Sequence, residues 1–151
     1  MKLSREQQII NTHLKAAKAY GELSYAKRLK VGALIVKEDR VISTGRNGTP
    51  TGRDNDCEYI SYNVHGEPIL VTKLEVCHAE MNAILFAARN GTSTNGCSLI
   101  VTHSPCFECS KMIVQCGIKE VYYDKEYRDL SAIDFLKECG IKVEKINNKL
   151  G

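Results

Sequence analysis

The second half of the chain alternates strand-like runs with helical segments, and this alternation restricts the fold more than any other feature. Apolar or alternating runs occupy residues 98–102, 121–123 and 141–146. Residues 105–117 and 131–139, between these runs, have the apolar spacing and the glycine stops of helices. Strands joined through helices run parallel with right-handed crossovers. The three runs are therefore expected to lie side by side, all in one direction.

The first half of the chain predicts a helix followed by a β-hairpin. Ser4 and Gln7 form a capping-box pattern, and apolar residues continue at helical spacing to about residue 20. Residues 31–36 and 41–44 are two apolar runs separated by a short polar turn. Such a pair is typical of two antiparallel strands.

The segment at residues 51–76 has no clear period and is rich in turn-forming residues. We expect a long irregular excursion there, with at most one short strand, and loops of this length are usually functional or disordered. Residues 78–90 then have one apolar helical face that ends at an Asn-Gly pair. The order αββαβαβαβ predicts a single α/β domain over residues 1–151, with a mixed five-stranded sheet covered by helices.

Composition places the chain among small globular proteins. It has 151 residues, of which 43% are hydrophobic and 26% charged, which is enough for one core. No apolar run approaches the ~20 residues of a membrane-spanning helix, and the polar start lacks the apolar stretch of a secretory signal. We therefore expect a cytoplasmic protein with no membrane partner, whose seven cysteines are reduced thiols or metal ligands.

The formal net charge of +3 is spread along the chain without a block of like charge. This balance suits a small anionic substrate. A nucleic-acid-binding protein more often carries a concentrated basic stripe, so we expect no nucleic-acid partner.

Two short segments, His78-Ala79-Glu80 and Pro105-Cys106-Phe107-Glu108-Cys109, have the residue types of a metal site. Each segment opens a helix, and helix N-termini favour thiolate over thiol. Cys106 and Cys109 lie three residues apart and share a helix face, while His78 completes a three-ligand set. Three protein ligands leave a fourth zinc position open for water, as in catalytic sites, and zinc lowers the pKa of that water to about 7.

The two segments together favour a zinc deaminase. Cys-x-x-Cys alone fits a redox pair or half of a structural zinc site, and His-x-Glu alone carries little information. His-x-Glu followed by Pro-Cys-x-x-Cys is the pattern of zinc nucleobase deaminases, in which hydroxide attacks the carbon bearing the amino group. Glu80 then has the place of the general acid and base. The remaining cysteines near apolar segments are expected to be buried by packing: Cys77, Cys97, Cys116 and Cys139.

At these residues the chain resembles the cytidine and deoxycytidylate deaminase superfamily, and most of all its deoxycytidylate (dCMP) branch from cells and large DNA viruses. The resemblance covers nearly the whole chain. It includes both zinc segments, the strand opening Val31-Gly32-Ala33 and the segment Asn47-Gly48-Thr49-Pro50, which is more specific to this branch than the metal motif. It implies a cytidine deaminase-like three-layer α/β/α fold, with helices on both faces of the sheet.

The resemblance implies hydrolysis of dCMP to dUMP and ammonia, a step that supplies dUMP for thymidylate synthesis, in the host cytosol if the chain is viral. It further implies one catalytic Zn²⁺ per chain, with Glu80 taking a proton from water and protonating N3 of the ring. By the same analogy Asn47 contacts the sugar, while Ala79 and Ser104 help to hold the base. Arg28 or Lys27, of this or a neighbouring subunit, is the candidate for the 5′-phosphate.

Relatives in this branch are commonly homohexamers that dCTP activates and dTTP inhibits, with Mg²⁺ accompanying the regulatory nucleotide. The resemblance therefore implies a homo-oligomer here, a hexamer or a trimer, with Arg46 and Gly48 as candidate regulatory residues. Arg46 stands where relatives usually have tyrosine, and it either adds a phosphate contact or removes a stacking contact.

Some relatives bind a second, structural zinc through two cysteines and histidines. Cys57 matches one of these cysteines, but Ala26 stands where the other is expected. The candidates that remain are Cys57, His65 and His103, an incomplete set, so we expect one zinc per chain.

Two other functions stay open. Another branch of the superfamily would act on tRNA adenosine, guanine or cytosine, although the dispersed charge and the long insert argue against a tRNA enzyme. A catalytically silent zinc-binding regulatory subunit is the second alternative, against which Glu80 argues.

Overall fold

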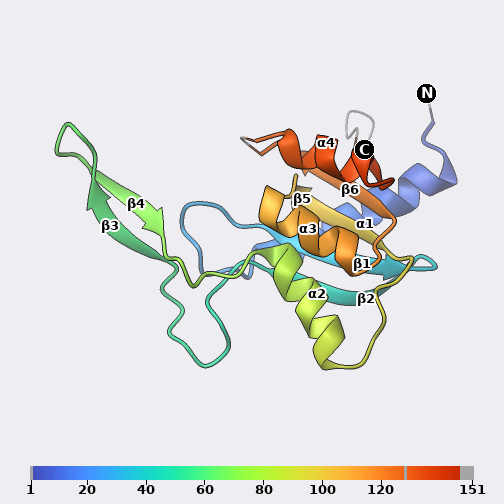
Figure 1. The fold of residues 1–151 in the computed structure, drawn as a ribbon, viewed down its shortest axis with the longest axis horizontal. Helices are drawn as coiled ribbons and strands as arrows, with labels where there is room; N and C mark the ends of the chain where they lie inside the picture. Colours follow the sequence, from blue (N-terminus) through green and yellow to red (C-terminus); the bar gives the residue numbers. More distant parts are fainter. Residues whose placement is uncertain (1, 128, 147–151) are drawn as a thin grey trace.

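The computed structural model describes residues 2–127 and 129–146, and its centre is one mixed β-sheet (Figure 1). The sheet has the strand order β2-β1-β5-β6-β7. Its strands are β1 (Gly32–Lys37), β2 (Arg40–Arg46), β5 (Ser98–His103), β6 (Glu120–Lys125) and β7 (Lys142–Lys145). The helices are α1 (Arg5–Gly21), α2 (Ala79–Arg89), α3 (Phe107–Gln115) and α4 (Ser131–Glu138).

Strand directions follow the connections along the chain. β1 pairs antiparallel with β2 and with β5, whereas β5, β6 and β7 pair parallel through the crossover helices α3 and α4. The capping box at Ser4 and Gln7 is present at the start of α1. The α/β fold with a mixed five-stranded sheet is therefore confirmed, including the common direction of the last three strands.

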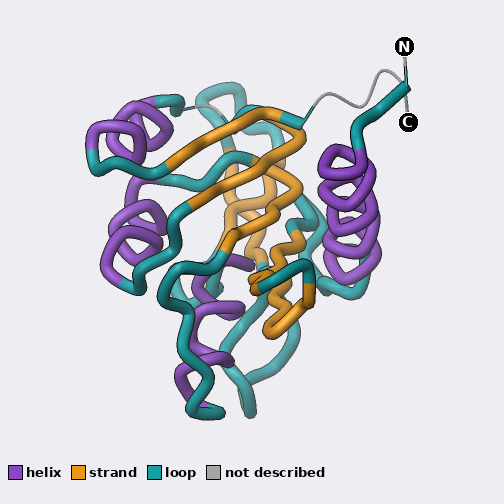
Figure 2. Tube along the Cα trace, turned by 90° about the vertical axis from the view of Figure 1, so that its right-hand side faces the viewer, coloured by secondary structure: helices purple, strands orange, loops and turns teal. Residues whose placement is uncertain are grey.

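Helices cover both faces of the sheet (Figure 2). Successive strand residues point to opposite faces, so each strand contributes to two apolar cores. α1 covers one face, where its side chains pack with alternate residues of β1, β5 and β6: Leu14, Ala17, Leu34, Ile100 and Tyr122. α2, α3 and α4 cover the other face with a larger core, which includes Ala83, Ile113, Leu136, Ile35, Leu99 and Val121. The result is the three-layer α/β/α arrangement.

The insert between β2 and α2 differs from the sequence expectation. It contains a second sheet of two antiparallel strands, β3 (Glu58–Tyr62) and β4 (Pro68–Thr72), where at most one strand was expected. The hairpin projects away from the main sheet (Figure 1). Tyr59 and its neighbour Ile60 are 50% and 63% exposed, so neither face is fully buried and the usual alternation of polar and apolar residues is absent.

The four cysteines that were expected to be buried by packing differ in their exposure. Cys97 is buried, as expected, and Cys77 and Cys116 are half-buried. Cys139 is exposed, so the prediction of burial is wrong there: it is the C-cap residue of α4 and lies beyond the apolar face of that helix. In the described residues no helix is both long and apolar enough to cross a membrane.

Candidate active site

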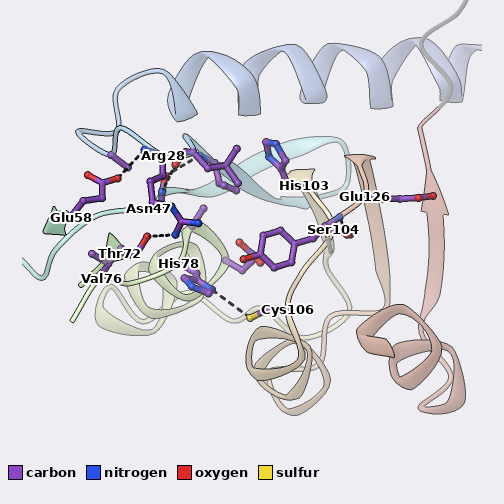
Figure 3. A pocket seen from close by; sticks show the side chains of 16 residues that line it. Arg28, Asn47, Glu58, Thr72, Val76, His78, His103, Ser104, Cys106 and Glu126 are labelled. Atoms are coloured by element: carbon purple, nitrogen blue, oxygen red, sulfur yellow. Dashed lines mark hydrogen bonds between the residues drawn. The ribbon is translucent and has the colours of Figure 1, made fainter. Parts of the chain in front are cut away.

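The predicted metal ligands meet where two helices begin. His78 is the N-cap residue of α2 and Cys106 is the N-cap residue of α3, and neither side chain caps its helix. Nδ1 of His78 instead lies 3.4 Å from Sγ of Cys106 and 3.4 Å from Sγ of Cys109. Within residues 2–127 and 129–146 these three side chains form the only group of three or more possible ligand atoms within 4.8 Å of one another. Figure 3 shows His78 and Cys106 facing each other.

Local packing fixes the start of α2 against the sheet. Backbone hydrogen bonds join Gly48 and Cys77 in both directions, at 3.0 and 2.8 Å, so the residue before His78 is tied to the segment just after β2. Gly45 lets the helix approach closely, because a Cβ at this position would lie 2.1 Å from the carbonyl oxygen of Ala79. Ser43 Oγ also donates a hydrogen bond of 2.6 Å to the Ala83 carbonyl.

The donor set fits zinc. It offers one imidazole nitrogen and two sulfurs from free cysteines, the ligands that zinc prefers in three-ligand catalytic sites. Hydrogen bonds with Cys109 and His78 together lower the pKa of Cys106 to about 4, against the opposing effect of burial. Cys109 has a raised pKa because it shares the first of these hydrogen bonds and is buried. These hydrogen bonds favour the thiolate form of Cys106, which is the form that binds zinc.

Glu80 lies beside this group without being part of it. Its side chain is in the first turn of α2, only 4% of the residue is exposed, and it lines the same cavity as His78 and Cys106. Burial raises the pKa of Glu80. A carboxyl group with a raised pKa binds and releases protons closer to neutral pH than an exposed glutamate does, which is what a general acid and base requires.

The cavity above the ligands has a volume of about 380 Å³, within the range of small-molecule sites. All of the residues predicted to hold base and sugar line it, namely Asn47, Ala79 and Ser104. Asn47 Nδ2 donates to the Leu29 carbonyl at 2.7 Å and its Oδ1 accepts from Val31 N at 2.9 Å. One N–H and one lone pair of the amide remain for a ligand. Ser104 Oγ accepts a hydrogen bond of 2.6 Å from Tyr127 N.

The two candidates for the phosphate differ in position. Arg28 lines the cavity, and Lys27 is not among its described lining residues. Arg46 and Gly48 lie elsewhere, in a second cavity of about 410 Å³ that also includes Arg89. Asn47 lines both cavities. The structure thus separates the candidate regulatory residues from the metal ligands.

The candidates for a second metal site are not brought into one group within the described chain. Cys57 and Ala26 are buried, whereas His65 lies exposed in the turn of the β3–β4 hairpin. His103 lines the cavity, and its Nδ1 lies 2.8 Å from Thr102 Oγ1. Burial lowers the pKa of His103, which favours its neutral form.

Four further polar residues that line the cavity were not predicted: Glu58, Thr72, Glu126 and Tyr127. The first two belong to the β3–β4 hairpin. Aromatic and β-branched residues on both sides of the glycine-containing turn Asn63-Val64-His65-Gly66 are a hairpin signal that could have located these strands. No sequence pattern indicates that the base of this hairpin lies beside the cavity.

A three-ligand nitrogen and sulfur site beside a buried glutamate, in a three-layer α/β/α fold, defines a zinc-dependent hydrolytic enzyme. Residues 4–125 match the cytidine and deoxycytidylate deaminase zinc-binding region. The chain therefore belongs to the cytidine and deoxycytidylate deaminase family, as its motifs predicted.

Individual relatives agree with this family. The chain is 36% identical to the deoxycytidylate deaminase of Enterobacteria phage T4, and the match covers 80% of each chain. It is 38% identical to ComE operon protein 2 of Bacillus subtilis (strain 168), covering 82% of this chain and 63% of that protein. The crystal structure of the dCMP deaminase from cyanophage S-TIM5 in complex with dCMP and dUMP superposes with a TM-score of 0.82 at 41% identity, over 95% of this chain and 99% of that chain. The predicted cytidine deaminase-like fold is thereby confirmed.

Proposed function

We propose that this protein hydrolyses dCMP to dUMP and ammonia. The observation that carries the proposal is one cavity that joins the His78, Cys106 and Cys109 group, the buried Glu80 and the guanidinium of Arg28. The relatives support the same substrate, since the phage T4 protein is a deoxycytidylate deaminase and the cyanophage structure holds dCMP and dUMP. The reaction supplies dUMP for thymidylate synthesis and belongs to pyrimidine nucleotide biosynthesis.

His78, Cys106 and Cys109 would hold the zinc, and a zinc ion there supplies the Lewis acid that makes water a nucleophile at neutral pH. Glu80 moves the protons. It takes a proton from the attacking water and gives it to N3 of the cytosine ring as the water oxygen bonds to C4. It then takes the second proton of that oxygen and passes it to the amino group, so that the C4–N bond breaks and ammonia leaves. A carboxyl group in this position typically contributes ~10²- to 10⁴-fold in rate.

The remaining cavity residues orient the nucleotide in this proposal. The backbone of Ala79 and the region of Ser104 hold the base, and the amide atoms that Asn47 has available contact the sugar. Arg28 binds the 5′-phosphate, because a guanidinium presents paired donors that match phosphate oxygens. Lys27 is the weaker candidate, since its side chain does not line the cavity.

Purified zinc-loaded protein is tested with dCMP, deoxycytidine and CMP, with ammonia release and ultraviolet absorbance as readouts. Turnover largely confined to dCMP is expected. Folded protein with one zinc per chain and no turnover on these substrates would reject the proposal, leaving other amino-bearing bases or a silent regulatory subunit. Strongly salt-dependent RNA binding would favour the tRNA branch instead.

We further propose that the second cavity binds a regulatory nucleotide, with dCTP activating, dTTP inhibiting and Mg²⁺ accompanying the triphosphate. Arg46 and Arg89 provide positive charge there, and Gly48 lines the same cavity. Asn47 borders both cavities, which gives a physical route from one nucleotide to the other. Adding dCTP with Mg²⁺ to the dCMP assay should raise the rate, and no response to dCTP or dTTP would contradict this site.

A homo-oligomer, either a hexamer or a trimer, is the proposed assembly. The exposed apolar side chains of the β3–β4 hairpin support it, because an isolated two-stranded hairpin is at best marginally stable in water. All seven cysteines are free thiols, which supports a reducing compartment, and we place the reaction in the cytoplasm.

A further inference from the structure

Two residues at the base of the β3–β4 hairpin face each other across its strands. Glu58 and Thr72 are register partners, and the hydrogen bond of 2.8 Å from Lys73 N to the Cys57 carbonyl closes the hairpin just beyond them. Both side chains line the cavity of the metal ligands. Glu58 is 4% exposed, although Tyr59 and Ile60, which follow it on the same strand, are exposed. A buried carboxylate there requires a specific partner.

The partner of both residues is the segment that carries Arg28. Glu58 Oε2 accepts hydrogen bonds from the backbone N–H groups of Lys27 at 2.8 Å and Arg28 at 2.9 Å. On the opposite strand, Thr72 Oγ1 accepts a hydrogen bond of 3.0 Å from Nη1 of Arg28. Figure 3 shows Arg28 beside both of these side chains. The hairpin thus holds Arg28 at two points: Glu58 binds the backbone of the arginine and Thr72 binds its guanidinium.

This arrangement leaves the charge of Arg28 available. Among the described lining residues of the cavity, Arg28 is the only arginine or lysine. Its hydroxyl partner is neutral, and the ion pairs of the described residues do not include Arg28. An arginine that is already held loses less rotamer freedom when an anion binds.

We propose that Glu58 and Thr72 are positioning residues that make the site select a 5′-phosphorylated nucleotide over the free nucleoside, by holding Arg28 toward the phosphate. This inference rests on the proposed function. It also assigns a purpose to the insert: its two strands bring one side chain each to the arginine, which a flexible loop would not do reproducibly. A purely structural role of Glu58 and Thr72 would affect phosphorylated and unphosphorylated ligands equally.

The test compares Thr72→Val, which removes the hydroxyl at nearly constant volume, with Thr72→Ser, which keeps it. kcat and KM are measured with dCMP and with deoxycytidine, and affinities are measured by calorimetry for the products dUMP and deoxyuridine. Thr72→Val should lower kcat/KM for dCMP about tenfold more than for deoxycytidine, mainly through KM, as the loss of one hydrogen bond to a charged group predicts. Its affinity for dUMP should fall by a similar factor relative to deoxyuridine, and Thr72→Ser should recover most of both losses.

Glu58→Gln tests the contact between the Glu58 carboxylate and the backbone of Lys27 and Arg28. If Glu58→Gln does not fold, the comparison of Thr72→Val with Thr72→Ser still decides the question. In an Arg28→Met background, Thr72→Val should cause no further loss of discrimination. Equal losses for dCMP and deoxycytidine, or an unchanged preference in Thr72→Val, would overturn the inference while leaving the proposed function intact. Absence of dCMP turnover by the wild-type protein would reject the proposed function instead.

Discussion

Glu80 is a buried carboxyl group next to three ligands for a cation, and this position predicts the effect of removing its charge. Glu80→Gln keeps the shape of the side chain but cannot take a proton from water. Turnover of dCMP should fall by ~10²- to 10⁴-fold, while zinc stays bound because Glu80 is not among the three ligand residues. Steady-state kinetics and zinc content by atomic absorption measure the two effects.

Glu108→Gln is the matched control for Glu80→Gln. Glu108 is in the first turn of α3, between the two cysteine ligands, but its side chain is 78% exposed and pairs with Lys111. Substituting it should change turnover little, since exposed ion pairs contribute little. Comparable losses in both variants, or loss of zinc from Glu80→Gln, would contradict the role given to Glu80.

The residues of the candidate site differed in how far the sequence could predict their positions. His78, Glu80, Cys106 and Cys109 were predictable because local spacing at two helix starts determines where these side chains point. Glu58 and Thr72 were not, because their contacts with Arg28 join residues 30 and 44 positions apart. No local pattern encodes such contacts.

At the scale of elements, the close contact between β2 and α2 predicts that Gly45 has no tolerated replacement. In Gly45→Ala the new Cβ would meet the Ala79 carbonyl oxygen at 2.1 Å and the Ala83 nitrogen at 2.6 Å. α2 must then move away from the sheet, which typically costs about 1–3 kcal/mol or more. Thermal and urea unfolding should show this loss. Gly48→Ala is the control for stability, because a Cβ there meets no atom within 4 Å.

β6 contains a carboxylate whose interactions predict a pH-dependent stability. Burial raises the pKa of Glu120, but hydrogen bonds from Tyr122 and Ser98 and the charges of Lys119 and Lys142 outweigh it, so the pKa is lowered overall. A lowered folded-state pKa stabilises the protein above the ordinary glutamate value of about 4.3, and this contribution disappears as pH falls through the folded-state pKa.

Glu120→Gln should therefore be less stable than the wild type at pH 7, and the difference should shrink below about pH 4. Urea unfolding at pH 7, 5 and 3.5 measures the difference in the free energy of unfolding between the two proteins. Zinc binding contributes to both proteins alike and therefore cancels in this difference. Glu144→Gln, an exposed carboxylate on β7, serves as the control. A difference that stays constant with pH would show that the loss comes from packing and not from the charge.

The elements of the main sheet were predictable, whereas the hairpin was not, for a physical reason. β1, β5 and β6 are buried on both faces and read as continuous apolar runs, and α1 begins with a complete capping box. In the hairpin, Tyr59, Ile60 and Tyr62 are all exposed within one chain. Because neither face of the hairpin is fully buried, its sequence does not need to alternate between polar and apolar residues. The missing alternation made the segment look irregular.

At the scale of the whole molecule, the projecting hairpin predicts how the protein associates. Tyr59, Ile60, Tyr62 and Val64 are 50%, 63%, 68% and 96% exposed. Several exposed apolar side chains on one projecting element are typical of protein interfaces. Light scattering should therefore give a mass well above the 16.8 kDa of one chain.

Polar substitutions on the hairpin test whether this surface holds the oligomer together. Ile60→Thr combined with Tyr62→Thr removes apolar area without touching the Glu58 and Thr72 contacts with Arg28, and the measured mass should move toward that of one chain. Leu130→Thr is the control, since Leu130 is 44% exposed at the start of α4, far from the hairpin (Figure 1). If the double variant keeps the wild-type mass, the subunits associate through another surface. If its zinc content and dCMP turnover also survive as a monomer, each chain carries a complete active site, and Arg28 serves the cavity of its own subunit.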